Sequence, residues 1–148
     1  MLDSNIIERL DKVATPFYYY DMDLFQKTVD HVAELAASHD IKVHYAVKAN
    51  VERRLLEYIS SKRFGADCVS GNEVLAALES GFPASKIVYA GVAKTDREIL
   101  IGIDHDIYCF NCESIEELQI IQELAAGRSK KVRVALRINP DVKAHTHA

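Results

Sequence analysis

Cysteine is scarce in this chain, and its three positions do not suggest a set of disulfides. Cys109 and Cys112 have the C-x-x-C spacing of some metal and redox sites, but residues 107–112 have the composition of a β-strand. Positions i and i+3 of a strand point to opposite faces of the sheet, which disfavours a shared site for the two thiols. We therefore expect buried free thiols, as in a protein of the reducing cytoplasm.

Long apolar runs and an excess of basic residues are also absent. No stretch approaches the ~20 consecutive apolar residues that a membrane span needs. Residues 1–5 lack the basic and apolar regions of a signal peptide. The formal net charge is −4 and the pI is about 5.8, which gives no electrostatic reason to bind nucleic acid or an anionic membrane. We expect a cytoplasmic protein without nucleic-acid or membrane partners.

The 148 residues, of which 49% are hydrophobic and 27% charged, suit one globular domain with a sizeable core. Strand-like segments alternate with helical ones along the chain. The predicted strands cover residues 42–48, 65–69, 87–92, 107–112 and 132–138. A helix is predicted over residues 23–38, with an apolar face of Leu24, Val29, Val32 and Leu35. Further helices are predicted from about 70 to 81, 95 to 102 and 114 to 127.

Three of these helices begin with the S/T-x-x-E pattern of a capping box, at Ser70, Thr95 and Ser114. In each, the hydroxyl oxygen is expected to accept a hydrogen bond from the third helical N–H. The glutamate of the same box is expected to reach back to the N–H of the cap residue itself. These patterns therefore predict where three helices start.

Strands that alternate with helices indicate a parallel sheet with right-handed crossovers. From the residues alone, a five-stranded doubly wound sheet and part of a β/α barrel are nearly equal choices. No G-x-G-x-x-G or G-K-[ST] loop follows any predicted strand, which disfavours a nucleotide-binding sheet.

The segment 43–50 (VHYAVKAN) contains the strongest candidate for catalysis. Alternation along a strand puts His44, Ala46 and Lys48 on one face, and Lys48 ends the predicted strand. The carboxyl edge of such sheets and barrels is where ligands bind. A lysine there has the chemistry of a Schiff-base lysine, although lysines that end amphipathic strands often only extend into water.

Four motifs, in order, resemble those of the pyridoxal-phosphate-dependent decarboxylases with an alanine-racemase-type barrel, especially the members that act on diaminopimelate. They are residues 15–21 (TPFYYYD), 45–50 (YAVKAN), 65–73 (GADCVSGNE) and 137–142 (RINPDV), the last followed by Thr146 and His147. The resemblance covers almost the whole chain. It implies decarboxylation of meso-diaminopimelate to L-lysine, with ornithine, arginine or carboxynorspermidine as alternative substrates. A non-catalytic pyridoxal-phosphate-binding homologue is a further alternative.

The resemblance favours the barrel over the doubly wound sheet. It implies that residues 21–148 are part, about five βα units, of a cofactor-binding (β/α)₈ barrel. Residues 1–20 would be an opening segment that pairs with a carboxyl-terminal β-domain. A closed barrel typically needs about 250 residues, so we expect an amino-terminal fragment of a homodimeric enzyme.

The same resemblance suggests roles for five residues, all toward pyridoxal 5'-phosphate and a small amino-acid substrate. Lys48 would form the imine with the cofactor, and Ala46 would leave space beside it. Asp67 would act as an acid near the cofactor, with a solvated strand-end carboxylate as the alternative. Arg137 would be an inward cation near the cofactor or, equally, an exposed salt-bridge partner. His147 would approach the substrate.

Other polar residues receive structural interpretations. We expect His44 to be a satisfied interior histidine, although it could tune Lys48. Lys94 resembles a lysine that relatives have at this turn, but a solvated turn lysine is the favoured interpretation. Tyr18, Tyr19 and Tyr20 are expected to form a β-strand that packs against the missing second domain. No metal site is predicted.

Overall fold

The computed structural model describes residues 4–140 of the chain. Its elements are α1 (Ser4–Leu10), α2 (Met22–Ser38), β1 (His44–Ala46), η1 (Val47–Ala49), α3 (Arg53–Ser61), β2 (Gly65–Cys68), α4 (Gly71–Glu79), η2 (Ala84–Lys86), β3 (Ile87–Tyr89), α5 (Asp96–Asp104), β4 (Cys109–Cys112), α6 (Ile115–Gly127) and β5 (Val134–Leu136). All five predicted strands are present, each shorter than predicted. Helices α1 and α3 were not predicted.

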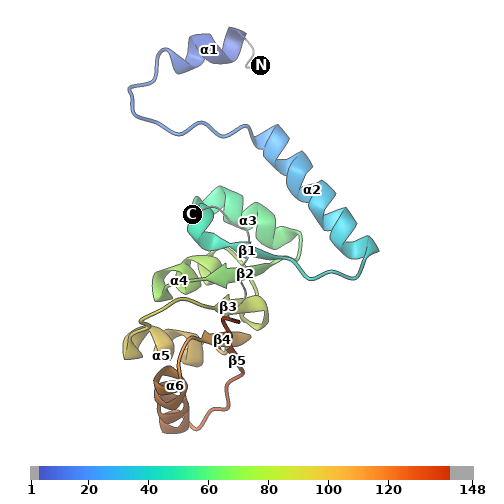
Figure 1. Cartoon of the computed structure of the whole chain (residues 1–148). Helices are drawn as coiled ribbons and strands as arrows, with labels where there is room; N and C mark the ends of the chain where they lie inside the picture. Colours follow the sequence, from blue (N-terminus) through green and yellow to red (C-terminus); the bar gives the residue numbers. More distant parts are fainter. Residues whose placement is uncertain (1–3, 141–148) are drawn as a thin grey trace.

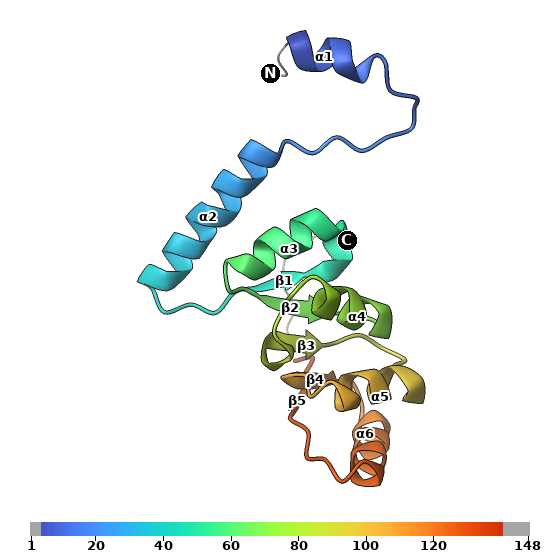
Figure 2. The same cartoon turned by 180° about the vertical axis from the view of Figure 1, so that it is seen from behind.

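The five strands form one parallel sheet in the order β1-β2-β3-β4-β5. Each strand therefore pairs with the next one along the chain, and the connecting helices α3 to α6 lie together on one side of the sheet (Figures 1 and 2). In a doubly wound sheet the strand order reverses at a switch point and helices cover both faces. Consecutive order with helices on one face is the arrangement of a β/α barrel wall, so the barrel alternative is confirmed.

The core lies between the sheet and these helices. Successive strands contribute buried residues at the same level, because Cys68 is in register with Tyr89 and Tyr89 with Phe110. The helices contribute residues spaced by one turn, such as Ile99 and Ile103 of α5. The opposite face of the sheet has no helix over it within residues 4–140 (Figure 1).

Two glycines near helix ends have different roles. Gly81 follows α4 at φ +87°, and Phe82 N–H donates to Ala77 O at 3.0 Å, as in a helix ending with a left-handed residue. Gly102 was predicted to end its helix, but it lies inside α5. A Cβ atom at Gly102 would come within 2.6 Å of the Phe110 ring, so this glycine allows β4 to pack closely against α5.

Helix α2 packs differently from the prediction. Of its predicted apolar face only Val29 is buried, whereas Leu24 is 63% exposed. It contacts Tyr58 of α3 in two ways: Phe25 packs on the Tyr58 ring with centroids 5.9 Å apart, and Asp30 accepts a hydrogen bond from the Tyr58 hydroxyl at 3.0 Å. The spacing of apolar residues predicts which face of a helix is apolar, but it does not predict which other element covers that face.

The three tyrosines form no strand within residues 4–140, and a strand that packs against a further domain stays a prediction. Residues 13–21 follow an irregular path between α1 and α2 (Figure 1), and the Tyr18 side chain is 90% exposed. No helix within residues 4–140 is both long and apolar enough to cross a membrane.

Gly65 is the position where we expect the sheet to be least tolerant of a side chain. A Cβ atom there would lie 2.5 Å from the His44 ring and 2.6 Å from the backbone oxygen of Lys86. Because the backbone oxygen cannot move without disturbing the sheet, Gly65→Ala should lower the free energy of unfolding by about 1–3 kcal/mol. Urea denaturation followed by circular dichroism measures this change.

Gly127→Ala is the matched control, because nothing lies within 4 Å of the added Cβ atom. Gly127 ends α6, so alanine should leave stability unchanged or raise it by up to about 1 kcal/mol. Equal effects of the two variants would contradict the close approach at Gly65.

Candidate active site at the carboxyl edge

The carboxyl ends of β1, β2 and β5 bring three predicted site residues to one edge of the sheet. Ala46 and Asp67 are Cα partners in the ladder between β1 and β2. Their neighbours Val47 and Cys68 are fully buried on the helix-covered side. Since side chains alternate along a strand, Ala46 and Asp67 share the uncovered face.

Lys48 was predicted to end its strand, but β1 ends at Ala46 and Lys48 lies in the 3₁₀ turn η1 that directly follows it. Its side chain is exposed, and its amine makes no hydrogen bond or ion pair with residues 4–140. The lysine lines an open hollow of about 530 Å³ together with Tyr18, Tyr20 and residues 49–52. A primary amine with no other partner, at the carboxyl end of a parallel strand, is available for a covalent bond to a ligand.

Asn50 fixes the shape of this turn and was overlooked in the sequence. Its backbone N–H donates to Val47 O at 3.1 Å, and its side-chain oxygen accepts from the N–H of Glu52 at 2.8 Å. Its side-chain amide donates to the Tyr20 hydroxyl at 3.0 Å. An asparagine that bonds the backbone two residues ahead is a typical turn former, and this was the available signal.

Asp67 and Tyr45 belong to neighbouring strands but point to opposite faces of the sheet, because the ladder partner of Asp67 is Ala46 and not Tyr45. Asp67 is half-buried in β2. The Tyr45 hydroxyl donates to the backbone oxygen of Asn50 at 3.3 Å. Burial raises the pKa of Tyr45, with a smaller contribution from Tyr20, so Tyr45 stays a neutral hydrogen-bond donor at physiological pH.

Arg137 follows β5 and is placed by the sheet itself, because its N–H donates to Cys112 O at 2.9 Å. Its Nη1 donates to both carboxylate oxygens of Glu113, at 3.2 and 3.3 Å. The side chain is 59% exposed. The salt-bridge alternative is thus present in the structure, and a contact with a cofactor stays a prediction. His147 lies outside the described residues.

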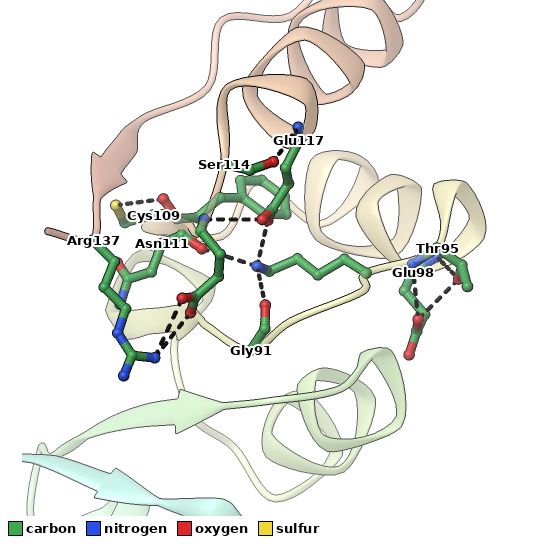
Figure 3. Close-up of polar contacts among 11 residues, drawn as sticks. Gly91, Thr95, Glu98, Cys109, Asn111, Ser114, Glu117 and Arg137 are labelled. Carbon is green, nitrogen blue, oxygen red and sulfur yellow. Dashed lines mark hydrogen bonds and ion pairs between the residues drawn. The ribbon is translucent and has the colours of Figure 1, made fainter. Parts of the chain in front are cut away.

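Lys94 is buried, and the prediction of a solvated turn lysine is wrong. Only 1% of its side chain is exposed. Its amine donates to Gly91 O at 2.6 Å, to Asn111 O at 2.9 Å and to a carboxylate oxygen of Glu117 (Figure 3). The amine also lies 5.4 Å from the centroid of the Tyr89 ring. All three donors of this ammonium group are therefore used.

The predicted capping boxes differ in detail. Thr95 and Glu98 form a complete box. Glu73 and Glu117 instead accept from the N–H of the residue before the cap, Val69 at 2.9 Å and Glu113 at 3.0 Å. The bonds from Gly71 N–H and then from Thr95 hold the pKa of Glu98 below its usual value. Carboxylates thus tie down three successive turns at this edge.

The cysteines are free and buried, as predicted. Burial, followed by the nearby charges of Glu73 and Asp67, raises the pKa of the Cys68 thiol to about 12. Burial also raises the pKa of Cys109 and Cys112. Within residues 4–140 no group of His, Cys, Asp and Glu side chains could hold a metal ion.

The chain is similar to known proteins over most of its length. Residues 23–148 match the family model described as the pyridoxal-binding domain of pyridoxal-dependent decarboxylases. Diaminopimelate decarboxylase of Bacteroides thetaiotaomicron is 52% identical over 96% of this chain, and that of Aquifex aeolicus is 41% identical over 90%. The crystal structure of the Helicobacter pylori diaminopimelate decarboxylase complexed with L-lysine matches 97% of the chain with a TM-score of 0.86 and 35% identity. The chain spans about a third of the length of these proteins, from 31% to 37%.

The buried Lys94–Glu117 pair leads to a prediction about stability. Lys94→Met would leave the Glu117 carboxylate, which is 11% exposed, without its cation. Removing one partner of a buried pair costs about 3–5 kcal/mol, and we expect a loss of this size in the free energy of unfolding, measured by urea denaturation.

Lys27→Met is the control, because Lys27 is exposed on α2 and should change stability by less than about 0.5 kcal/mol. The double variant Lys94→Met/Glu117→Leu should recover part of the loss, since no unpaired charge remains. A Lys94→Met protein as stable as the Lys27→Met protein would contradict the buried pair.

Proposed function

The chain belongs to the pyridoxal-dependent decarboxylases, whose pyridoxal-binding domain matches residues 23–148, and we propose that it holds pyridoxal 5'-phosphate through Lys48. In this proposal the chain provides the cofactor-binding face of an enzyme that decarboxylates meso-diaminopimelate to L-lysine. The observation that carries the proposal is the amine of Lys48, which has no partner within residues 4–140 and follows the carboxyl end of β1.

The other lysines near the sheet are less suitable. Lys94 also lies at the carboxyl edge, but binding a cofactor would require its amine to give up Gly91 O, Asn111 O and Glu117 together. Lys42 precedes β1 and so lies at the amino edge of the sheet. Lys48 alone among these three combines the carboxyl edge with a free amine in the described part of the chain.

The surrounding residues fit such a cofactor. Ala46 leaves room on the uncovered face, and its ladder partner Asp67 supplies a half-buried carboxylate that can accept a hydrogen bond or a proton. Arg137 supplies a cation with N–H groups that suit a phosphate or carboxylate. When bound, the cofactor would supply an electron-accepting ring, which makes the loss of CO₂ from an amino acid feasible. We propose His147 as a substrate contact.

The choice of substrate is supported by relatives. Two proteins 52% and 41% identical to the chain are diaminopimelate decarboxylases, and a structural neighbour is complexed with L-lysine. A viral arginine decarboxylase bound to agmatine is only 24% identical, so it supports the fold alone. Meso-diaminopimelate is therefore preferred to arginine.

The proposal extends to assembly. The opening segment, residues 1–20, presents Tyr18 with 90% and Phe17 with 39% of its surface exposed. We propose that this segment packs against a β-domain of the kind expected from the sequence, that residues 21–148 form barrel wall, and that the enzyme is a cytoplasmic homodimer. Exposed aromatic side chains are common at such interfaces.

One test of the proposed function concerns which lysine the cofactor is attached to. Borohydride reduction of the complete gene product loaded with pyridoxal phosphate, followed by peptide mass mapping, should find the cofactor on Lys48, since a free amine is the group that can bond its aldehyde carbon. Lys48→Ala should remove the adduct, whereas Lys42→Ala should keep it. An adduct on Lys42 or Lys94 would overturn the assignment.

Another test concerns the decarboxylation itself. The complete gene product should release CO₂ and L-lysine from meso-diaminopimelate, and Lys48→Ala should lower that rate by about a thousandfold or more. Lys27→Ala is the matched control on the exposed face of α2 and should keep the rate. Turnover of ornithine or arginine instead would overturn the substrate, and an adduct without any decarboxylation would indicate a non-catalytic homologue.

A further inference from the structure

The guanidinium of Arg137 does not stand alone at the edge of the sheet. Its Nη1 donates to both oxygens of Glu113, the first residue after β4. Within the described part of the chain, its Nε and Nη2 make no hydrogen bond. The Glu113 contact thus restrains the side chain while leaving one edge of the guanidinium, with Nε and Nη2, for another acceptor.

Glu113 is itself firmly held. Only 16% of its side chain is exposed, compared with 59% for Arg137. Its backbone N–H donates to Glu117 Oε2 at 3.0 Å, which fixes the start of the β4–α6 turn. The carboxylate that meets Arg137 therefore projects from a backbone position that α6 determines.

The support continues into the interior. The other oxygen of Glu117 accepts from Lys94, and Lys94 also bonds Gly91 O and Asn111 O. Figure 3 shows Gly91, Asn111 and Glu117 converging on this amine while Arg137 lies at the outer end of the network. A continuous set of polar contacts thus runs from the β3–α5 turn through β4 and α6 to Arg137.

We propose that Glu113 is a positioning residue that holds Arg137 for an oxygen anion of the bound ligands. The proposal rests on the proposed function and adds a residue to it. Two sources share this chemistry, the phosphate of the cofactor and a carboxylate of the substrate. In either case Glu113 restricts the rotamers of Arg137 before the anion arrives, so less conformational entropy is lost on binding.

The test compares Glu113→Gln, Arg137→Gln and the double variant in the complete gene product. Cofactor dissociation constants and the kcat and KM for meso-diaminopimelate are measured for each. Weakening a charge-assisted contact to Arg137 should change one of these constants by about tenfold. A raised cofactor dissociation constant would identify the phosphate as the anion, and a raised KM with normal cofactor binding would identify the carboxylate.

A residue that acts through Arg137 should lose its effect when Arg137 is absent. We therefore expect Glu113→Gln to change the constant little in the Arg137→Gln background, whereas a merely structural role would add to the loss. Glu113→Asp keeps the charge and should recover part of the effect. Glu123→Gln, on an exposed position of α6, is the control and should behave as the unchanged protein.

Additive effects, or an effect of Arg137→Gln without one of Glu113→Gln, would overturn the role of Glu113. These results leave the proposed function standing as long as reduction still attaches the cofactor to Lys48. If Arg137→Gln changes neither constant, Arg137 has no such contact and the inference is wrong. Without an adduct on Lys48, the proposed function itself fails.

Discussion

Pairing of each parallel strand with the next one along the chain is the constraint on which the rest of the structure depends. Right-handed crossovers between neighbours in consecutive order must all pass on the same side of the sheet. Helices α3 to α6 therefore cover one face, and every strand points its carboxyl end to the same edge. Residues as far apart in sequence as Ala46 and Arg137 therefore lie at the same edge of the sheet, although β1 and β5 are its outermost strands and each strand has only three or four residues.

Because the strands are short, they do not determine the path of the turns that follow them. Charged side chains make the hydrogen bonds that fix these turns. Glu73, Glu98 and Glu117 accept hydrogen bonds from the backbone N–H groups of Val69, Thr95 and Glu113, just before α4, α5 and α6. These positions are also where the partial positive charge of a helix amino terminus favours a carboxylate. Glu117 has a second task, because its other oxygen receives the buried amine of Lys94. A buried charge is tolerated here because each of its hydrogen bonds is satisfied.

Sequence patterns predicted what is encoded locally. Ser114 and Gly127 marked the ends of α6 correctly, because caps act over three or four residues. The environment of Lys94 could not be found in this way, since its partners Asn111 and Glu117 are 17 and 23 residues away. Exposure of Leu24 on α2 likewise depends on which elements surround the helix, and periodicity contains no such information.

The two lysines at the carboxyl edge differ in how the fold uses their amines. Lys94 lies within reach of two carbonyl oxygens and a carboxylate, so its amine is fully engaged. Lys48 sits in a 3₁₀ turn whose hydrogen bonds are made by Val47 and Asn50, so the turn is closed without the lysine side chain. Because Asn50 also bonds Tyr20, the same turn ties the opening segment to the edge of the sheet. The backbone around Lys48 is thereby held in place, while its amine has no partner in the described part of the chain, a combination that suits covalent binding of a ligand.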